Sequence, residues 1–157
     1  MHDNGITIRE TPMTQILYLL MLFVAGVLAS CQPLVNARLA QKIGLVESSL
    51  ISFSVGTIFL LVMTLLFGRG SLGNITQAAW WQFTGGLMGA FFVFTVILVV
   101  PHLGTGAVMA ATIAAQLLMA LLLDHYQAFG FRHIPLTLPR LLGAALMLVG
   151  TWLIIRT

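Results

Sequence analysis

Four polar side chains within or beside long apolar stretches are the residues of this sequence that could contact a ligand. They are three amides and one carboxylate: Gln32, Asn36, Gln116 and Glu47. An amide offers both donors and acceptors for hydrogen bonds, and a carboxylate can hold a proton or a cation. Because polar groups are costly to place in an apolar segment, such residues are candidates for a substrate pathway.

Gln32 and Asn36 are four residues apart, so they share one face of a helix. Pro33 lacks a backbone N–H and frees the carbonyl of Ala29, which predicts a kink beside that face. A kinked helix with two amides can line a cavity, with Gln32 inside and Asn36 at the mouth. The alternative is that both amides hydrogen-bond neighbouring helices, each bond stabilising the fold by roughly 0.6–2 kcal/mol.

Gln116 is the deepest polar residue, and Glu47 is at a helix start. Gln116 is expected about 4 Å from the middle of its segment, and Gln32 about 9 Å from the middle of its own, toward the opposite surface. Inverting a second copy would move its Gln116 to the side of Gln32, which favours an antiparallel pair. Glu47 falls in a first helical turn, where the helix dipole favours an anion. It is either a helix-start residue at the interface or a lateral gate.

Catalytic and metal-binding patterns are absent from the sequence. The four histidines have no ligand partner three or four residues away: His2, His102, His125 and His133. The single cysteine, Cys31, excludes an intrachain disulfide and a cysteine-rich metal site. No phosphate-binding loop or nucleophile motif occurs either. We therefore expect no enzymatic activity, no metal and no cofactor.

The composition identifies the surroundings in which these residues work. Of the 157 residues, 59% are hydrophobic and 7% are charged, whereas soluble proteins carry roughly 25% charged residues. So few charges cannot cover the surface of a soluble globule, and the chain is predicted to lie in a lipid bilayer. The basic residues are scattered singly, so no nucleic-acid partner is expected.

Crossing the hydrocarbon takes about 20 mostly apolar residues, and five segments qualify: Thr14–Ala37, Leu45–Phe67, Trp80–Val100, Gly104–Leu123 and Pro139–Ile155. The sequence thus predicts an all-α integral membrane fold. A leader over residues 1–13 precedes a single five-helix transmembrane domain over residues 14–157. The connections are short, with a loop over residues 38–44 and a tight hairpin at residues 101–103.

Five crossings place the two termini on opposite sides of the membrane. The N-terminal side then collects four basic residues, Arg9, Arg69, Arg132 and Arg140, and the other side three, Arg38, Lys42 and Arg156. The positive-inside rule needs a larger excess to fix an orientation. The nearly equal numbers of basic residues predict either a weak preference for one membrane orientation or insertion in both orientations. Because many transporters consist of two inverted halves, the chain is expected to form half of one.

Small residues predict where helices approach closely. Gly85 and Gly89 form one small-xxx-small pair, and Gly106, Ala110 and Ala114 form a ridge on the next segment. These five positions are expected to pack against neighbouring helices, within one chain or between two.

Two further features lie at predicted helix ends. Asp124 ends the fourth segment, where a negative charge opposes the helix dipole, so we expect compensation from His125, Arg132 or Arg140. Trp80 and Trp81 open the third segment and are expected to be interfacial anchors. A stacking wall for a flat cation is the alternative.

The order of these residues resembles a known family. It comprises Gly26, Gln32 and Asn36, then Ser52-Phe53-Ser54-Val55-Gly56, Trp80-Trp81, Gly85-Gly86, Pro101, Ala115-Gln116-Leu117, Asp124-His125 and Arg140-Leu141-Leu142-Gly143. Together these resemble the YdcZ-type family of bacterial inner-membrane proteins, within the drug/metabolite transporter superfamily. The resemblance covers about residues 17–155. One departure is Gln127-Ala128, where the resemblance leads us to expect a glycine sooner after the aromatic residue.

The resemblance implies a five-span drug/metabolite-transporter-like half in the bacterial inner membrane that exports a small molecule. It would work as a homodimer, antiparallel or otherwise, or with a paralogous five-span partner, and alternate access between the two sides. The absence of charge at mid-span favours a neutral, zwitterionic or lipophilic substrate. Two alternatives remain open: a passive channel that uses the same amides, and a non-transporting accessory subunit that needs neither Gln32 nor Gln116.

Overall fold

A computed structural model describes residues 11–156 of the chain, so the predicted leader lies outside it except for residues 11–13. Seven helical elements follow one another: α1 (Pro12–Ile43), α2 (Leu45–Phe67), η1 (Leu72–Gln77), η2 (Trp80–Phe83), α3 (Thr84–His125), η3 (Ala128–Gly130) and α4 (Leu138–Arg156). The described residues contain no strand. The predicted all-helical class is confirmed.

Four of the helical segments are long and apolar enough to cross a membrane, judged by length and composition: Pro12–Ile43, Leu45–Phe67, Trp80–His125 and Leu138–Arg156. Leu45–Phe67 coincides with the predicted second segment. The α4 helix extends the predicted fifth segment by one residue at each end. The third apolar segment contains both the third and the fourth predicted ones.

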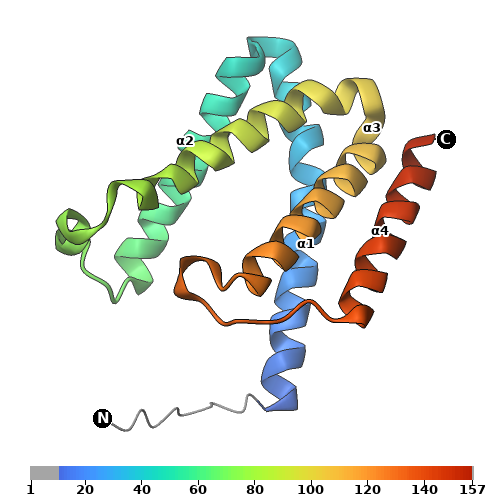
Figure 1. The fold of residues 1–157 in the computed structure, drawn as a ribbon. Coiled ribbons are helices and arrows are strands. Elements are labelled where there is room, and N and C mark those ends of the chain that lie inside the picture. Colours follow the sequence, from blue (N-terminus) through green and yellow to red (C-terminus); the bar gives the residue numbers. More distant parts are fainter. Residues whose placement is uncertain (1–10, 157) are drawn as a thin grey trace, which may run out of the picture. The chain divides into compact units, whose positions relative to one another are not determined.

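The α3 helix turns sharply at Gly104, where the backbone has a φ of 75° and a ψ of 158°. These angles are not helical, and a positive φ is accessible to glycine without a side-chain clash. Thr84–Leu103 and Thr105–His125 are therefore two helical stretches of 20 and 21 residues. The predicted hairpin at residues 101–103 is wrong by a few positions, because Pro101 lies inside the first stretch and Gly104 makes the turn (Figure 1).

The connection between α1 and α2 is shorter than predicted. The α1 helix continues to Ile43 and α2 begins at Leu45, so Gly44 alone separates them. The predicted loop over residues 38–44 is thus wrong, since Arg38 and Lys42 belong to the last turns of α1. Gly44 makes the reversal with a φ of 103° and a ψ of 158°, a region that is essentially restricted to glycine.

The described chain divides into two units inside α1, one ending at Gln32 and the other beginning at Pro33. The first unit is a single apolar helix from Pro12 to Gln32. The second unit holds the end of α1 and all later elements. Pro33 is itself buried at the boundary.

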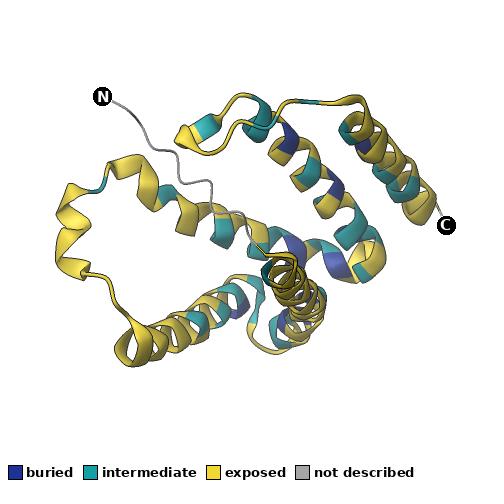
Figure 2. Cartoon of the chain, turned by 90° about the horizontal axis from the view of Figure 1, so that it is seen from below, coloured by how far each residue is buried: buried dark blue, intermediate teal, exposed yellow. Residues whose placement is uncertain are grey.

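The core of the second unit surrounds the Gly104 turn. Val96 and Val100 precede the turn and Val108 follows it, and all three pack with Ala37 from the end of α1. Most other residues are exposed, as the yellow ribbon of Figure 2 shows. The exposed residues of α2 include large apolar ones. Exposed apolar surface of this kind is what a lipid-facing helix presents.

Neighbouring helices in the second unit follow the order of the chain. α2 lies beside the first stretch of α3, and the second stretch of α3 lies beside α4 (Figure 1). Ala114 of α3 and Ala144 of α4 are both buried. The Thr151 hydroxyl donates a hydrogen bond to the Ala110 carbonyl oxygen at 3.2 Å, which joins the two helices.

Candidate functional site

The predicted pathway residue Gln116 lies near the middle of the second stretch of α3. The midpoint of Thr105–His125 is residue 115, so Gln116 is one residue beyond it, about 1.5 Å along the axis. Its side chain is exposed and has no hydrogen-bond partner in the described part of the chain. Gln32 is the last residue of the first unit, directly before the buried Pro33.

Asn36 lies at what we call the α1–α2 junction, formed by Asn36, Gly44, Glu47, Ser48 and Ser52. Its side chain is buried and its Nδ2 donates to the Ser52 hydroxyl at 3.1 Å. Ser48 has no exposed surface, and its hydroxyl donates to the Asn36 carbonyl oxygen at 2.7 Å. These two hydrogen bonds tie the end of α1 to α2.

Glu47 occupies the first turn of α2 and is exposed. Its carboxylate folds back over Gly44, into the space that a Cβ atom at that position would take. A negative charge beside the first backbone N–H groups of a helix is stabilised by the helix dipole. Glycine is favoured at residue 44 by its backbone angles, whereas the carboxylate above it ends a flexible, exposed side chain that can move aside.

The predicted small-residue positions have different neighbours. Gly89 faces α2, where the ring of Phe53 is 3.5 Å from the position of an added Cβ. Gly106 and Ala110 border a groove between α3 and α4, and Ala114 is buried. Gly85 has open space in place of a neighbour, because it lines a pocket at the start of α3.

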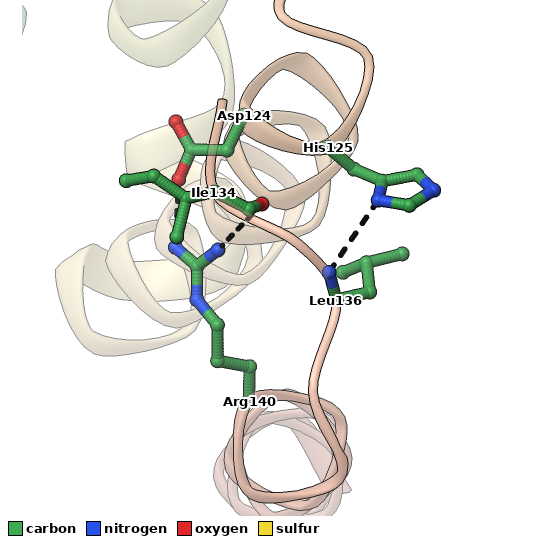
Figure 3. Close-up of polar contacts among 5 residues, drawn as sticks. All are labelled: Asp124, His125, Ile134, Leu136 and Arg140. Atoms are coloured by element: carbon green, nitrogen blue, oxygen red, sulfur yellow. Dashed lines mark hydrogen bonds and ion pairs between the residues drawn. The ribbon is translucent and has the colours of Figure 1, made fainter. Parts of the chain in front are cut away.

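The α3–α4 connection is held by an ion pair. Asp124 and Arg140 meet at 2.6 Å, with side chains 35% and 29% exposed. Arg140 was one of the three partners expected for Asp124, and it also donates to the Ile134 carbonyl oxygen at 3.3 Å (Figure 3). Asp124 ends one helix and Arg140 begins the next, so each charge alone opposes its helix dipole. The ion pair compensates both of these unfavourable interactions.

Backbone and ring contacts complete this connection. The Asp124 carbonyl accepts the N–H of Ile134 at 3.0 Å, and Nδ1 of His125 accepts the N–H of Leu136 at 3.4 Å (Figure 3). The rings of His125 and His133 have centroids 5.9 Å apart. These contacts fix the chain that leads from α3 back to α4.

Two residues of the connection have a left-handed backbone without being glycine. Gln127 has a φ of 50° and Phe129 a φ of 57°, which costs about 1–2 kcal/mol for each residue. Gln127 falls where the family resemblance suggested a glycine. A glycine would fit this position because it adopts a left-handed backbone without a side-chain clash. Phe129 uses its conformation to stack on Trp81, with ring centroids 5.5 Å apart and planes inclined by 26°.

An open pocket surrounds this stacked pair, and we call it the aromatic pocket. It has a volume of about 480 Å³ and is lined by Trp81, Gln82, Thr84, Gly85, Met88, Phe129 and Phe131. None of these residues is charged. Its size lies within the range of small-molecule sites, roughly 300–1,000 Å³, and its lining is mostly apolar, as is usual for them.

Comparison with known proteins identifies the family. A family model described as "Putative inner membrane exporter, YdcZ" matches residues 17–153. The "Inner membrane protein YdcZ" of Escherichia coli (strain K12) is 32% identical over 147 residues, which cover 92% of this chain and 98% of that relative. The chain belongs to the YdcZ family. No solved structure matches it.

Membership of the YdcZ family agrees with the apolar helices described above. The protein is a multi-pass protein of the inner membrane, in a family whose model carries the description "Putative inner membrane exporter". The range that matches the YdcZ family runs from α1 into α4, so it includes the α1–α2 junction, Gln116 and the aromatic pocket.

The sequence reasoning missed most of the aromatic pocket in this YdcZ-family chain. Trp81 was expected to be an interfacial anchor or, as the alternative, part of a stacking wall for a flat cation. Phe129 and Phe131 lie about 50 residues later and were not connected to it. A signal was present in the aromatic residues that flank Gly130, beside a helix end. Their contact with Trp81 depends on a left-handed backbone at Phe129, and sequence periodicity carries no information about that angle.

Proposed function

We propose that the protein is a five-crossing half of a small-molecule exporter that works as a dimer by alternating access. The proposal rests on membership of an exporter family and on the exposed amide of Gln116. An unpaired amide in hydrocarbon is costly, and Gln116 lies near the centre of a stretch long enough to cross a membrane. Either a second subunit or a polar substrate cavity could supply a hydrogen-bond partner for this amide and so remove the cost.

The Gly104 turn supports a count of five crossings. The stretches on its two sides have 20 and 21 residues, and each alone reaches the length of about 20 residues that one crossing requires. An odd number of crossings is what an inverted repeat requires when two halves are fused directly, and two separate copies in opposite orientations would form the same arrangement. The nearly equal numbers of basic residues on the two sides support such a pair. The alternative arrangement is a dimer of this chain with a paralogous five-span partner.

The pathway residues of the proposal are those predicted from the sequence. Gln32 and Gln116 would line a cavity between the two copies, Asn36 would support the helix beside it, and Glu47 would lie at a gate. No Asp, Glu, Lys, Arg or His occurs between Thr105 and Leu123, so the substrate expected at mid-span is uncharged, zwitterionic or lipophilic.

The arrangement of the dimer is tested by cross-linking between two tagged copies in a Cys31→Ser background. One copy carries Gln32→Cys and the other Gln116→Cys, and a short thiol cross-linker is applied to membranes. An antiparallel pair brings these two positions to the same side of the membrane midplane, so a mixed product is expected. Gln41→Cys is the matched control, because it lies about 14 Å further along α1. Products only between identical positions would contradict the antiparallel dimer.

The transport step is tested by flux in proteoliposomes with a panel of uncharged and zwitterionic solutes. Saturable flux is expected, with a rate lowered about tenfold by Gln116→Leu, the effect of losing one hydrogen bond. The matched control Gln41→Leu should retain the original rate. Linear flux without saturation would instead identify a passive channel. Unchanged function in Gln32→Ala and Gln116→Leu, with loss only at Gly89, which packs against Phe53 of α2, would identify an accessory subunit.

A further inference from the structure

The aromatic pocket has features that interfacial anchoring does not explain. An anchor needs only an aromatic ring at the level of the lipid headgroups, and Trp80, 80% exposed, meets that need beside Trp81. Phe129, in contrast, lies on a backbone with a positive φ, which bulky residues rarely adopt. Residues held in unfavourable conformations cluster at binding sites. The conformation of Phe129 brings its ring against Trp81 and forms one wall of the pocket.

The connection that carries this wall is held in place from outside the pocket. The Asp124–Arg140 ion pair and the bond from Ile134 to Asp124 both fix the chain on either side of η3. None of these residues lines the pocket. The pocket therefore has a fixed frame and a lining that is free to contact a ligand.

The polar atoms of the lining restrict the chemistry of that ligand. Gln82 accepts the N–H of Ala79 through Oε1 at 2.8 Å, which leaves its Nε2 group as a donor. Thr84 donates its hydroxyl to the Trp81 carbonyl at 2.7 Å, which leaves the oxygen as an acceptor. A ligand with a carbonyl or ether oxygen can use the first of these groups, and one with a hydroxyl or N–H can use the second.

The charge of the ligand is restricted as well. No charged side chain lines the pocket, so neither a cation nor an anion would find an opposite charge there. Thr84 and Gly85 form the first turn of α3, and the positive end of a helix dipole disfavours a cation. A cation could gain from the aromatic faces, but the helix end opposes it.

We propose that the aromatic pocket binds an uncharged planar aromatic molecule that carries a hydrogen-bond acceptor, and that this is the substrate class of the transporter. The assignment of this ligand class as the transported substrate rests on the proposed function. Flat rings would stack on the exposed faces of Trp81 and Phe131, the thioether of Met88 would contact the ring edge, and Nε2 of Gln82 would bind the acceptor. The position at the start of α3 would let the ligand enter from the lipid headgroup region.

Binding is tested with prodan, an uncharged planar naphthyl ketone, on the full chain in lipid nanodiscs. Saturable binding is measured by fluorescence after subtraction of empty nanodiscs, which removes partition into lipid. One site per chain is expected, with ethidium, a planar cation, binding much more weakly. Trp81→Leu should weaken prodan binding about tenfold through loss of the stacked wall. The adjacent Trp80→Leu is the matched control and should leave binding unchanged.

A second pair of variants separates loss of the pocket from loss of the fold. Gly85→Leu places a side chain in the pocket, and no atom lies within 4 Å of its Cβ position. Gly86 also has nothing within 4 Å and does not line the pocket, so Gly86→Leu is its control. Both variants should keep the thermal stability of the original chain, and only Gly85→Leu should abolish saturable binding.

The outcomes distinguish this inference from the proposed function because the binding measurement involves no flux. Absence of saturable binding, equal loss in both variants of either pair, or Trp81-dependent binding of ethidium as tight as that of prodan would overturn the inference. Saturable flux of other solutes would in those cases leave the transporter proposal intact. Prodan binding that meets the expectations, without any flux, would retain the site and overturn the transporter.

Discussion

Two helix connections in this protein use polar and strained residues in opposite ways. At the α1–α2 junction one glycine reverses the chain, and the polar groups of Asn36 and Ser48 are buried and bonded to each other and to α2. At the α3–α4 connection the polar groups hold the frame, while the aromatic side chains of Phe129 and Phe131 are exposed. Buried and satisfied polar groups stabilise a fold, whereas exposed rings on a fixed frame are available to a ligand.

The unfavourable backbone angles differ in the same way. Gly44 carries its positive φ without a side chain, so the junction stores no strain. Gln127 and Phe129 carry theirs with side chains, and part of the cost is offset by the stacking of Phe129 on Trp81 and by the hydrogen bond from the Gly130 N–H to the Gln127 carbonyl. The comparison assigns the first connection to stability and the second to binding, and the following changes test that assignment.

The largest effect is expected for Gly44→Ala. An alanine would have to adopt a backbone region that side chains avoid, so the free energy of unfolding should fall by about 2–3 kcal/mol. Thermal unfolding of the purified protein in detergent measures it. Gly56→Ala, inside α2 with nothing within 4 Å of its Cβ position, is the control and should not destabilise. Equal stability of the Gly44→Ala and Gly56→Ala proteins would contradict a structural role for Gly44.

Ser48→Ala should have the next largest effect. It removes the hydrogen bond to the Asn36 carbonyl at a site without exposed surface. Because that carbonyl lies inside α1 and is also a helix acceptor, the expected cost is that of one hydrogen bond, about 1–1.5 kcal/mol. The neighbour Ser49 bonds within its own helix, to the Leu45 carbonyl. Ser49→Ala should therefore cost less than Ser48→Ala in the same unfolding measurement, and the reverse order would contradict the account of the junction.

A smaller effect is expected from Asp124→Asn at the second connection. The ion pair is about one third exposed, so solvent screening limits its loss to roughly 1 kcal/mol. The double exchange Asp124→Arg with Arg140→Asp restores the pair and gives each charge the helix end that its dipole favours. Thermal stability of the exchanged protein should be at least that of Asp124→Asn. A less stable exchanged protein would show that the other bonds of Arg140 dominate.

The smallest effect, and the only gain, is expected from Gln127→Gly. Glycine adopts the left-handed backbone without a clash, so stability should rise by up to about 1 kcal/mol, reduced by the larger entropy of the unfolded chain. Prodan binding should not change, because Gln127 does not line the aromatic pocket. A loss of binding in this variant would mean that the strain at residue 127 itself positions Phe129.

The sequence predicted features that depend on residues close together in the chain better than features that depend on backbone angles or on contacts between distant residues. Hydrophobic length predicted α2 to the residue, and the dipole argument included Arg140 among the partners of Asp124. The junction was missed because Arg38 and Lys42 resemble loop residues, although they continue α1. The aromatic pocket was missed because it depends on the backbone angle of Phe129 and on contact between residues far apart in the chain. The pathway role of Gln32, Asn36, Gln116 and Glu47 stays a prediction.

The most direct test of the central claim counts labels on single molecules. In a Cys31→Ser background, Ser71→Cys marks the α2–α3 connection and Thr137→Cys the α3–α4 connection, and both residues are exposed. Spheroplasts are treated with a membrane-impermeant maleimide, and intact mass gives the number of labels on each chain. If Gly104 divides α3 into two crossings, both cysteines lie on the same side of the membrane.

We predict molecules with no label and molecules with two labels, both populated because the chain inserts in both orientations. Molecules with two labels only, or with none only, would retain five crossings and require an oppositely oriented paralogous partner. Molecules with a single label would contradict the account, because they would place the two connections on opposite sides and make α3 one crossing.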